Sequence, residues 1–178
     1  MLKGERCNLR PFKETDLDEF INLRNDISGV GPFSSIKLVS EVGIKQEFRE
    51  TGFLGDTKGR LLIVDDSNGM QRMIGFVSYF PPNMFYDGFE VGYRIFRKED
   101  MGKGYASDAL KTLVRYLFKT RHFNRLQLTL NNGNIGSERV AQKCGFTREG
   151  IARGASSENG VIFDIVVYSL LRSEFKDL

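Results

Sequence analysis

The stretch EDMGKGYASDALKTLVRYLF, Glu99 to Phe118, joins a glycine loop directly to the strongest helical pattern in the chain. From Ala106 onward, apolar residues recur every three or four positions, which predicts an amphipathic helix with one buried face. The preceding segment FEVGYRIF (89–96) has the composition of a strand. A strand followed by a glycine loop and a helix N-terminus can bind a phosphate group, because the first helical amides lack carbonyl partners.

Taken alone, this loop has two interpretations, an anion site or a plain glycine turn. A Walker A loop requires a hydroxyl residue after its lysine, whereas Lys103 is followed by Gly104. A dinucleotide fingerprint requires a third glycine where Ser107 stands, and it also requires an acidic residue about 20 positions further on. Neither of these nucleotide-binding motifs is therefore present.

The composition is that of an ordinary globular protein. The 178 residues are 40% hydrophobic and 28% charged, with a formal net charge of +3. No basic run suggests nucleic acid, and no apolar stretch approaches the ~20 residues of a membrane span. The polar start of the chain does not read as a signal peptide. We therefore expect a single domain over 1–178 in the cytoplasm, with neither a nucleic-acid nor a membrane partner.

The residue types available limit the chemistry. Cys7 and Cys144 are isolated, and no CxxC motif is present, so we expect neither zinc nor another metal. His122 is the only histidine, and nothing around it suggests a Ser-His-Asp triad. Catalysis is therefore expected to use carboxylates, hydroxyls and backbone amides.

The order of predicted elements indicates a mixed α/β domain with one central sheet. Residues 2–11 read as a first strand ended by Pro11, and Thr15 and Ser40 are candidate caps of two helices. Besides the strand 89–96 and the helix from Ala106, the pattern predicts strands at 61–66, 72–80, 125–130, 147–154 and 162–171 and a helix at 135–143. The strict alternation of a doubly wound fold is missing.

A second motif follows the predicted strand 125–130. NIGSERVAQKCGF (134–146) places Asn134, Ser137, Val140, Lys143, Gly145 and Phe146 at fixed intervals. Together with EVGYRIFRKEDMGKGYA (90–106), it resembles the GNAT superfamily of N-acetyltransferases. The likeness is greatest to the Rim-type branch, which includes enzymes that acetylate N-terminal amines of ribosomal proteins. This resemblance implies a mostly antiparallel sheet splayed at two parallel strands and flanked by helices.

The chain departs from the family pattern at two positions. The family's acetyl-CoA loop reads Q/R-x-x-G-x-G/A, and Met101, Gly104 and Ala106 occupy its defined positions, with methionine in place of glutamine or arginine. Ala141 stands where many members carry a tyrosine that acts as general acid, although alanine is common in the Rim-type branch.

The resemblance implies a set of residues that bind acetyl-CoA, with no metal required. Its pantetheine arm would pair with the backbone at Ile95 and Phe96, in the splay between strands 89–96 and 125–130. Asn134 would hydrogen-bond the arm or its neighbouring backbone, cap the helix that follows, or do both. The pyrophosphate would rest on the loop amides, those of Met101, Gly102, Lys103, Gly104, Tyr105 and Ala106.

Two residues are candidates for catalysis. An amine with a pKa near 10 arrives mostly protonated at neutral pH, so it must lose a proton before attack. The resemblance makes Glu90 the base, although an exposed carboxylate or a partner of Arg94 is the alternative. Ser137 would hydrogen-bond the leaving thiolate, unless it serves only as a cap. Phe85 and Tyr86 are expected either to line the substrate site or to pack as an anchor of their own loop.

The function that follows is an acetyl-CoA-dependent N-acetyltransferase. It would transfer acetyl to a primary amine, foremost a protein N-terminal α-amine, by direct attack in a ternary complex. One alternative keeps the chemistry but uses a small amine such as an antibiotic, a polyamine or an amino sugar. Another is a non-catalytic CoA-binding regulatory module. The chain is expected to be a monomer or a homodimer.

Overall fold

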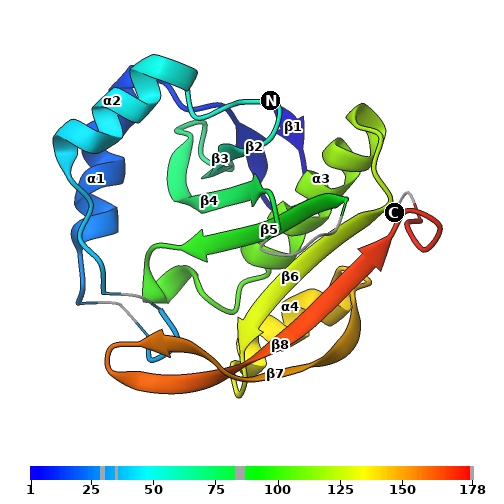
Figure 1. Cartoon of the computed structure of the whole chain (residues 1–178). Coiled ribbons are helices and arrows are strands. Elements are labelled where there is room, and N and C mark those ends of the chain that lie inside the picture. Colours follow the sequence, from blue (N-terminus) through cyan, green and yellow to red (C-terminus); the bar gives the residue numbers. More distant parts are fainter. Residues whose placement is uncertain (29–30, 35, 83–86, 177–178) are drawn as a thin grey trace.

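The computed structural model describes residues 1–28, 31–34, 36–82 and 87–176. In this part of the chain, eight strands form one sheet in the order β1-β2-β3-β4-β5-β6-β8-β7 (Figure 1). Only β5 and β6 pair in parallel. The strands are β1 Leu2–Lys3, β2 Asn8–Arg10, β3 Gly59–Asp65, β4 Arg72–Phe80, β5 Gly88–Ile95, β6 Arg125–Asn131, β7 Thr147–Glu158 and β8 Val161–Leu171.

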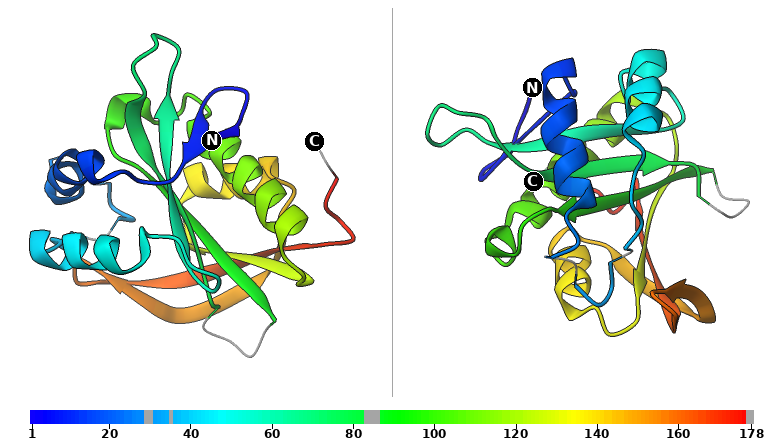
Figure 2. Two further views of the ribbon diagram at one scale, coloured as in Figure 1. Left: turned by 90° about the horizontal axis from the view of Figure 1, so that it is seen from above. Right: turned by 90° about the vertical axis from the view of Figure 1, so that its left-hand side faces the viewer.

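The four α-helices of the described chain cover both faces of the sheet. α1 (Leu17–Asn25) and α2 (Glu41–Thr51) lie on one face, and α3 (Tyr105–Thr120) and α4 (Ile135–Lys143) lie on the other (Figure 2). The run LLIV in β3 is buried on both sides because alternate side chains enter two separate cores. Leu61 and Ile63 join the α3 side, and Leu62 and Val64 join the α1 side. No helix of the described residues is long and apolar enough to cross a membrane.

The first predicted strand is divided into the hairpin β1–β2, which corrects the expectation for residues 2–11. The carboxylate of Asp108 on α3 accepts hydrogen bonds from the amides of Glu5, Arg6 and Cys7 at 3.0, 2.8 and 2.9 Å. Gly4 permits this close approach, since a Cβ there would lie 2.4 Å from Asp108 Oδ2. A carboxylate distant in sequence therefore sets the turn.

The first helix does not begin at Thr15, which corrects a second expectation. A short 3₁₀ turn, Glu14–Asp16, precedes α1, and the carboxylate of Asp16 accepts from the amide of Lys13 at 2.7 Å. The same carboxylate forms an ion pair with Arg10 at 2.7 Å. The prediction for α2 is confirmed, because Ser40 Oγ accepts from the amide of Gly43 at 3.3 Å.

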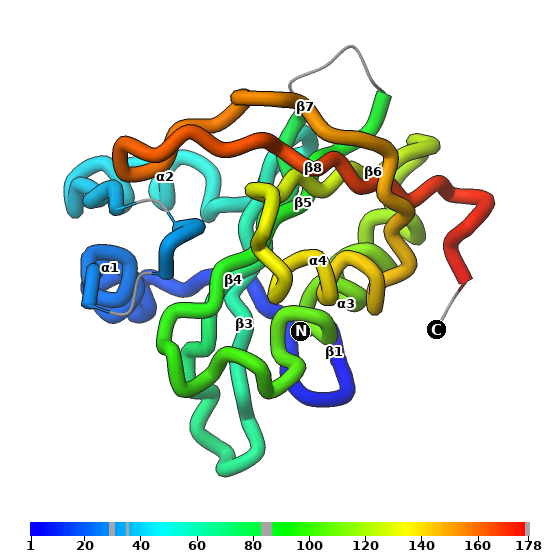
Figure 3. Tube along the Cα trace, turned by 90° about the horizontal axis from the view of Figure 1, so that it is seen from below, coloured from blue at the N-terminus to red at the C-terminus, as the bar shows by residue number. Residues whose placement is uncertain are grey.

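The sheet opens between its two parallel strands. β5 and β6 are paired only where Gly88 to Glu90 lie beside Arg125 to Gln127. Beyond that point the two strands draw apart (Figure 3). The predicted sheet, mostly antiparallel and splayed at one parallel pair, is therefore confirmed.

Candidate active site

The glycine loop and the N-terminus of α3 border a polar cavity of about 880 Å³. The first hydrogen bond of α3 runs from the amide of Asp108 to the carbonyl of Gly104 at 3.1 Å. The amides of Tyr105, Ala106 and Ser107 precede it and have no helical partner. Gly104 caps the helix with φ +91°, a left-handed conformation that glycine adopts without strain. The loop therefore has the geometry of an anion cradle.

Met101 differs from its predicted role at this loop. Its amide donates to the carbonyl of Lys98 at 3.1 Å, within the short 3₁₀ turn Lys98–Asp100. That hydrogen bond occupies the amide that the resemblance assigned to the pyrophosphate. The cradle amides accordingly begin after Met101.

Arg6 is a residue of this site that the sequence did not indicate. The Asp108 carboxylate fixes the turn that carries Arg6, and a Cβ on Gly104 would lie 3.0 Å from Arg6 Cδ. Burial raises the pKa of Asp108, but the amide hydrogen bonds outweigh this effect and hold it below its ordinary value. Asp108 thus remains an anion that keeps Arg6 beside the loop. No local pattern links residues about a hundred positions apart, so sequence spacing could not find this pair.

The cavity carries basic side chains beside the acidic Glu5, Asp65 and Asp108, and its loop is anchored. Lys103, Lys111 and Lys143 line it together with Arg6. The carboxylate of Asp100, only 1% exposed, receives two hydrogen bonds from Arg72 at 2.7 and 2.9 Å. The hydroxyl of Tyr105 donates to Asp65 at 2.6 Å. These contacts hold the loop in place before any ligand arrives.

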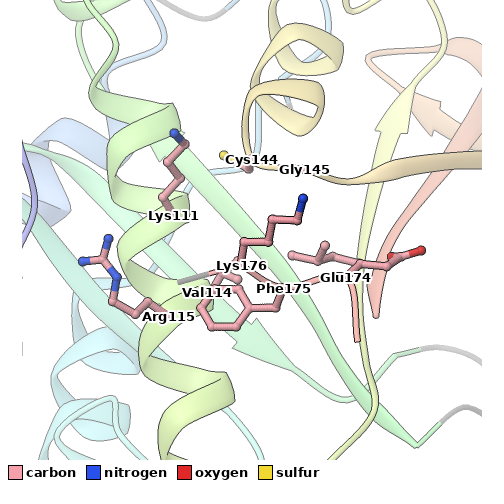
Figure 4. A pocket seen from close by; sticks show the side chains of 9 residues that line it. Lys111, Val114, Arg115, Cys144, Gly145, Glu174, Phe175 and Lys176 are labelled. Atoms are coloured by element: carbon pink, nitrogen blue, oxygen red, sulfur yellow. The ribbon is translucent and has the colours of Figure 1, made fainter. Parts of the chain in front are cut away.

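A second cavity of about 260 Å³ lies against the outer side of α3. Lys111 and Arg115 project from α3, and Phe175 and Lys176 come from the segment after β8 (Figure 4). Lys111 lines both cavities. Burial raises the pKa of the nearby Cys144 thiol to about 12, so Cys144 is unreactive at neutral pH.

Glu90 lies where β5 and β6 begin to separate. Its side chain is buried, with 8% of the residue exposed, and it accepts hydrogen bonds from Thr129 Oγ1 at 2.5 Å and Gln127 Nε2 at 3.3 Å. Glu90 is therefore neither an exposed strand carboxylate nor a partner of Arg94. Both donors come from β6, the predicted strand 125–130, in which no individual site residue was predicted.

Asn134 and Ser137 lie at the start of α4. The Asn134 carbonyl oxygen accepts from the amide of Ser137 at 3.1 Å, so Asn134 is the helix cap. The Ser137 hydroxyl is not used as a cap and lies near Tyr93. The Tyr93 hydroxyl is buried and makes no hydrogen bond with the described residues. Burial raises the pKa of Tyr93 to about 12, and the neighbouring Ser137 opposes that shift.

The backbone amides of Ile95 and Phe96, at the end of β5, point in opposite directions. The amide of Phe96 donates to the carbonyl of Ile74 in β4 at 3.0 Å. Because successive residues of a strand point their polar groups to opposite sides, the Ile95 backbone faces the opening toward β6. Of the two positions predicted for the pantetheine arm, only Ile95 has its amide on that side.

Two segments distant in sequence meet at the turn between β7 and β8. Asn159, in the turn between β7 and β8, donates to the carbonyl of Ser34 at 3.2 Å and accepts from the amide of Ile36 at 3.3 Å. The rings of Phe33 and Phe163 lie 5.7 Å apart. Phe85 and Tyr86, predicted to bind substrate, lie outside the described residues.

Comparisons with known proteins agree with this geometry. The acetyltransferase (GNAT) domain family matches residues 6–147. YdaF of Bacillus subtilis, a proposed ribosomal N-acetyltransferase, is 32% identical over 142 residues, which cover 72% of this chain and 77% of YdaF. This relationship supports the predicted Rim-type branch.

Two solved structures share the fold. A spermidine N-acetyltransferase from Vibrio cholerae, in complex with CoA and spermine, has a TM-score of 0.78 and 21% identity over 96% of this chain and 98% of that one. RimL, a ribosomal L7/L12 α-N-protein acetyltransferase in complex with coenzyme A, has a TM-score of 0.77 and 18% identity over 96% of both chains. The chain therefore belongs to the GNAT family and is an N-acetyltransferase that uses acetyl-CoA.

Proposed function

We propose that this enzyme acetylates a primary amine, foremost the N-terminal α-amine of a protein, by direct attack in a ternary complex. The observation that carries the proposal is the buried Glu90, held by two donors at the point where the sheet opens. The name of YdaF, a ribosomal N-acetyltransferase, supports a protein acceptor. The spermidine enzyme has the same fold, so a small amine is the competing acceptor.

Different residues of the chain carry out different steps of the proposed reaction. The amides at the start of α3 and the basic side chains around them bind the pyrophosphate of acetyl-CoA. Glu90 takes the proton of the incoming ammonium group, directly or through water. The free amine then attacks the thioester carbonyl, so that a C–N bond forms and the C–S bond breaks. A backbone amide at the opening is suited to stabilise the negative charge that develops on the carbonyl oxygen.

The leaving thiolate requires a hydrogen-bond donor or a proton. Ala141 supplies none, and the hydroxyls of Ser137 and Tyr93 lie close together beneath the opening. With a pKa of about 12, Tyr93 remains protonated at neutral pH and can donate. We assign the thiolate to Ser137, with Tyr93 as the donor behind it.

Two measurements test the proposed function. In a thermal-shift assay, acetyl-CoA should raise the melting temperature, whereas ATP should leave it unchanged. Release of free CoA thiol should then depend on an added amine, measured across peptides with free N-termini, the same peptides acetylated at the N-terminus, spermidine and an aminoglycoside. A chain that binds acetyl-CoA but consumes none with any amine would be a non-catalytic binding module, and the proposal would fail.

A further inference from the structure

Three arginines lie near Phe76 on the α1 and α2 side of the sheet, and two of them stand against its ring. Arg24 on α1 and Arg60 on β3 place their Cζ atoms 5.4 and 5.5 Å from the ring centroid. Arg94 on β5 is the cross-strand partner of Phe76, so its side chain emerges on the same face. Positive charge is therefore concentrated at one point of this face.

Within the described part of the chain, only one of the three arginines has an acidic partner. Arg60 lies 3.6 Å from the carboxylate of Glu47. Arg24 and Arg94, both partly buried, form no ion pair and no hydrogen bond with any described residue, and the Arg24 Nε atom is buried without a partner. Burial, together with repulsion from Arg94 and Arg60, lowers the pKa of Arg24 to about 10.

An unpaired charge that has lost part of its water destabilises the folded chain. Groups whose ionisation is perturbed cluster at functional sites, where a ligand can supply the missing partner. The guanidinium group suits a carboxylate or a phosphate, which it can bind through two parallel hydrogen bonds. Arg24 and Arg94 therefore have the properties of an anion site.

This anion site shares a strand face with the proposed base. Glu90 and Arg94 are four residues apart on β5, which corresponds to roughly 13 Å along an extended strand. We infer that the acceptor carries an anionic group, a carboxylate or a phosphate, that binds Arg24 and Arg94 while its amine reaches Glu90. This inference rests on the proposed function and narrows its acceptor to amines that also carry a negative charge.

The distance and the charge both restrict the acceptor. A peptide advances about 3.3 Å per residue when extended, so an acidic side chain within the first few residues of an N-terminus can reach this site. A polyamine would instead place additional cations next to two arginines that have no acidic partner among the described residues, which is unfavourable. The arginines thus favour, as acceptor, a protein N-terminus followed by acidic residues and disfavour spermidine.

The test uses the full-length enzyme and matched acceptors. Peptides that differ only in glutamate or glutamine at positions two to four should differ in KM by about tenfold, with the acidic peptide lower and kcat similar. Glucosamine 6-phosphate and glucosamine form a second pair, which distinguishes a phosphate from a peptide carboxylate as the source of the anion. Spermidine is the cationic comparison.

Variants connect this preference to the two arginines. Arg24→Gln and Arg94→Gln should each remove most of the preference for the acidic peptide, because each deletes one of the two guanidinium groups that bind its carboxylate. Arg24→Lys should restore part of it. Arg49→Gln, which removes an exposed positive charge from α2, is the control and should retain the full preference. Since neither arginine has an ion-pair or hydrogen-bond partner among the described residues, neither glutamine variant should melt at a lower temperature than the wild type.

The outcomes separate this inference from the proposed function. Equal KM values within both acceptor pairs, or a preference for spermidine, would overturn the anion site while amine acetylation stood. A preference for the acidic peptide that persists in both glutamine variants would overturn the assignment to Arg24 and Arg94. Failure of every amine to release CoA thiol would overturn the proposed function itself.

Discussion

The two faces of β5 differ in whether their buried charged groups have partners. On the side of α3, Asp108 accepts from three amides and Asp100 from Arg72, so each buried acid has its partners. On the side of α1, Arg24 and Arg94 have none among the described residues. The buried acids of the cofactor side are therefore paired without a ligand, whereas the proposed acceptor side carries two arginines that have no acidic partner among the described residues.

The largest expected effect comes from crowding the glycine loop on the cofactor side. In Gly104→Val, a branched side chain would have to adopt φ +91°, and its Cβ would lie 3.0 Å from Arg6 Cδ. Both the helix start and the position of Arg6 would be disturbed. We expect no detectable binding of acetyl-CoA in isothermal titration calorimetry.

Gly102→Ala is the matched control for this variant. Gly102 has φ +74°, but nothing lies within 4 Å of an added Cβ. The left-handed conformation alone costs about 1–2 kcal/mol, so the affinity should fall by no more than ~30-fold. Wild-type affinity in Gly104→Val would remove the loop from the phosphate site.

The second effect comes from the carboxylate that joins the first hairpin to α3. Asp108→Asn replaces two acceptor oxygens with one and turns an amide group toward the backbone donors. We expect a loss of stability on the order of 2–3 kcal/mol, measured by urea unfolding at pH 7. Affinity for acetyl-CoA should also fall, because the turn that carries Arg6 is released. Asp56→Asn, at an exposed position, should change neither.

The pH dependence of the stability difference between wild type and Asp108→Asn tests the role of the same carboxylate. The pKa of Asp108 is lowered in the folded chain, so its stabilisation is complete above the ordinary aspartate pKa of about 3.9. This stabilisation is lost as the pH falls below about 3.9 and through the lowered pKa that Asp108 has in the folded chain. The stability gap between wild type and Asp108→Asn should be constant near neutrality and close in acid. A gap independent of pH would contradict this role.

The smallest effect concerns a solvent-exposed charge at the cavity. Lys143→Gln should weaken acetyl-CoA binding by about two- to fivefold at low salt, because exposed charges contribute less than 1 kcal/mol. The difference should disappear at 1 M salt, where the screening length is only about 3 Å. Lys37→Gln, outside the cavity, is the control. An effect that persists at high salt would indicate a buried contact instead.

The same comparison explains what could be predicted from the sequence. The loop at Gly104, the α3 helix and the cap Ser40 depend on local backbone preferences, and those leave a pattern in neighbouring residues. The contact between Asp108 and Arg6 and the donors Thr129 and Gln127 depend on how separate elements pack. No spacing encodes such contacts. Thr15 was wrong as a cap because Asp16 is held by Arg10 and Lys13.

The acceptor side was the least predictable for a related reason. Arg24, Arg60 and Arg94 come from three elements, and each alone resembles an ordinary surface arginine. Their significance appears only when the fold brings them together near Phe76, where among the described residues Arg60 alone has an acidic partner. Specificity for the acceptor is therefore carried by side chains that local sequence patterns do not connect.

Glu90→Gln tests most directly whether the two sides meet at Glu90. The amide oxygen of glutamine can still accept from Thr129, but the side chain can no longer take a proton. With acetyl-CoA and a peptide acceptor, kcat should fall by about a hundredfold or more, while the dissociation constant of acetyl-CoA should stay within about twofold. Undiminished turnover in this variant would contradict the assignment of Glu90 as the base.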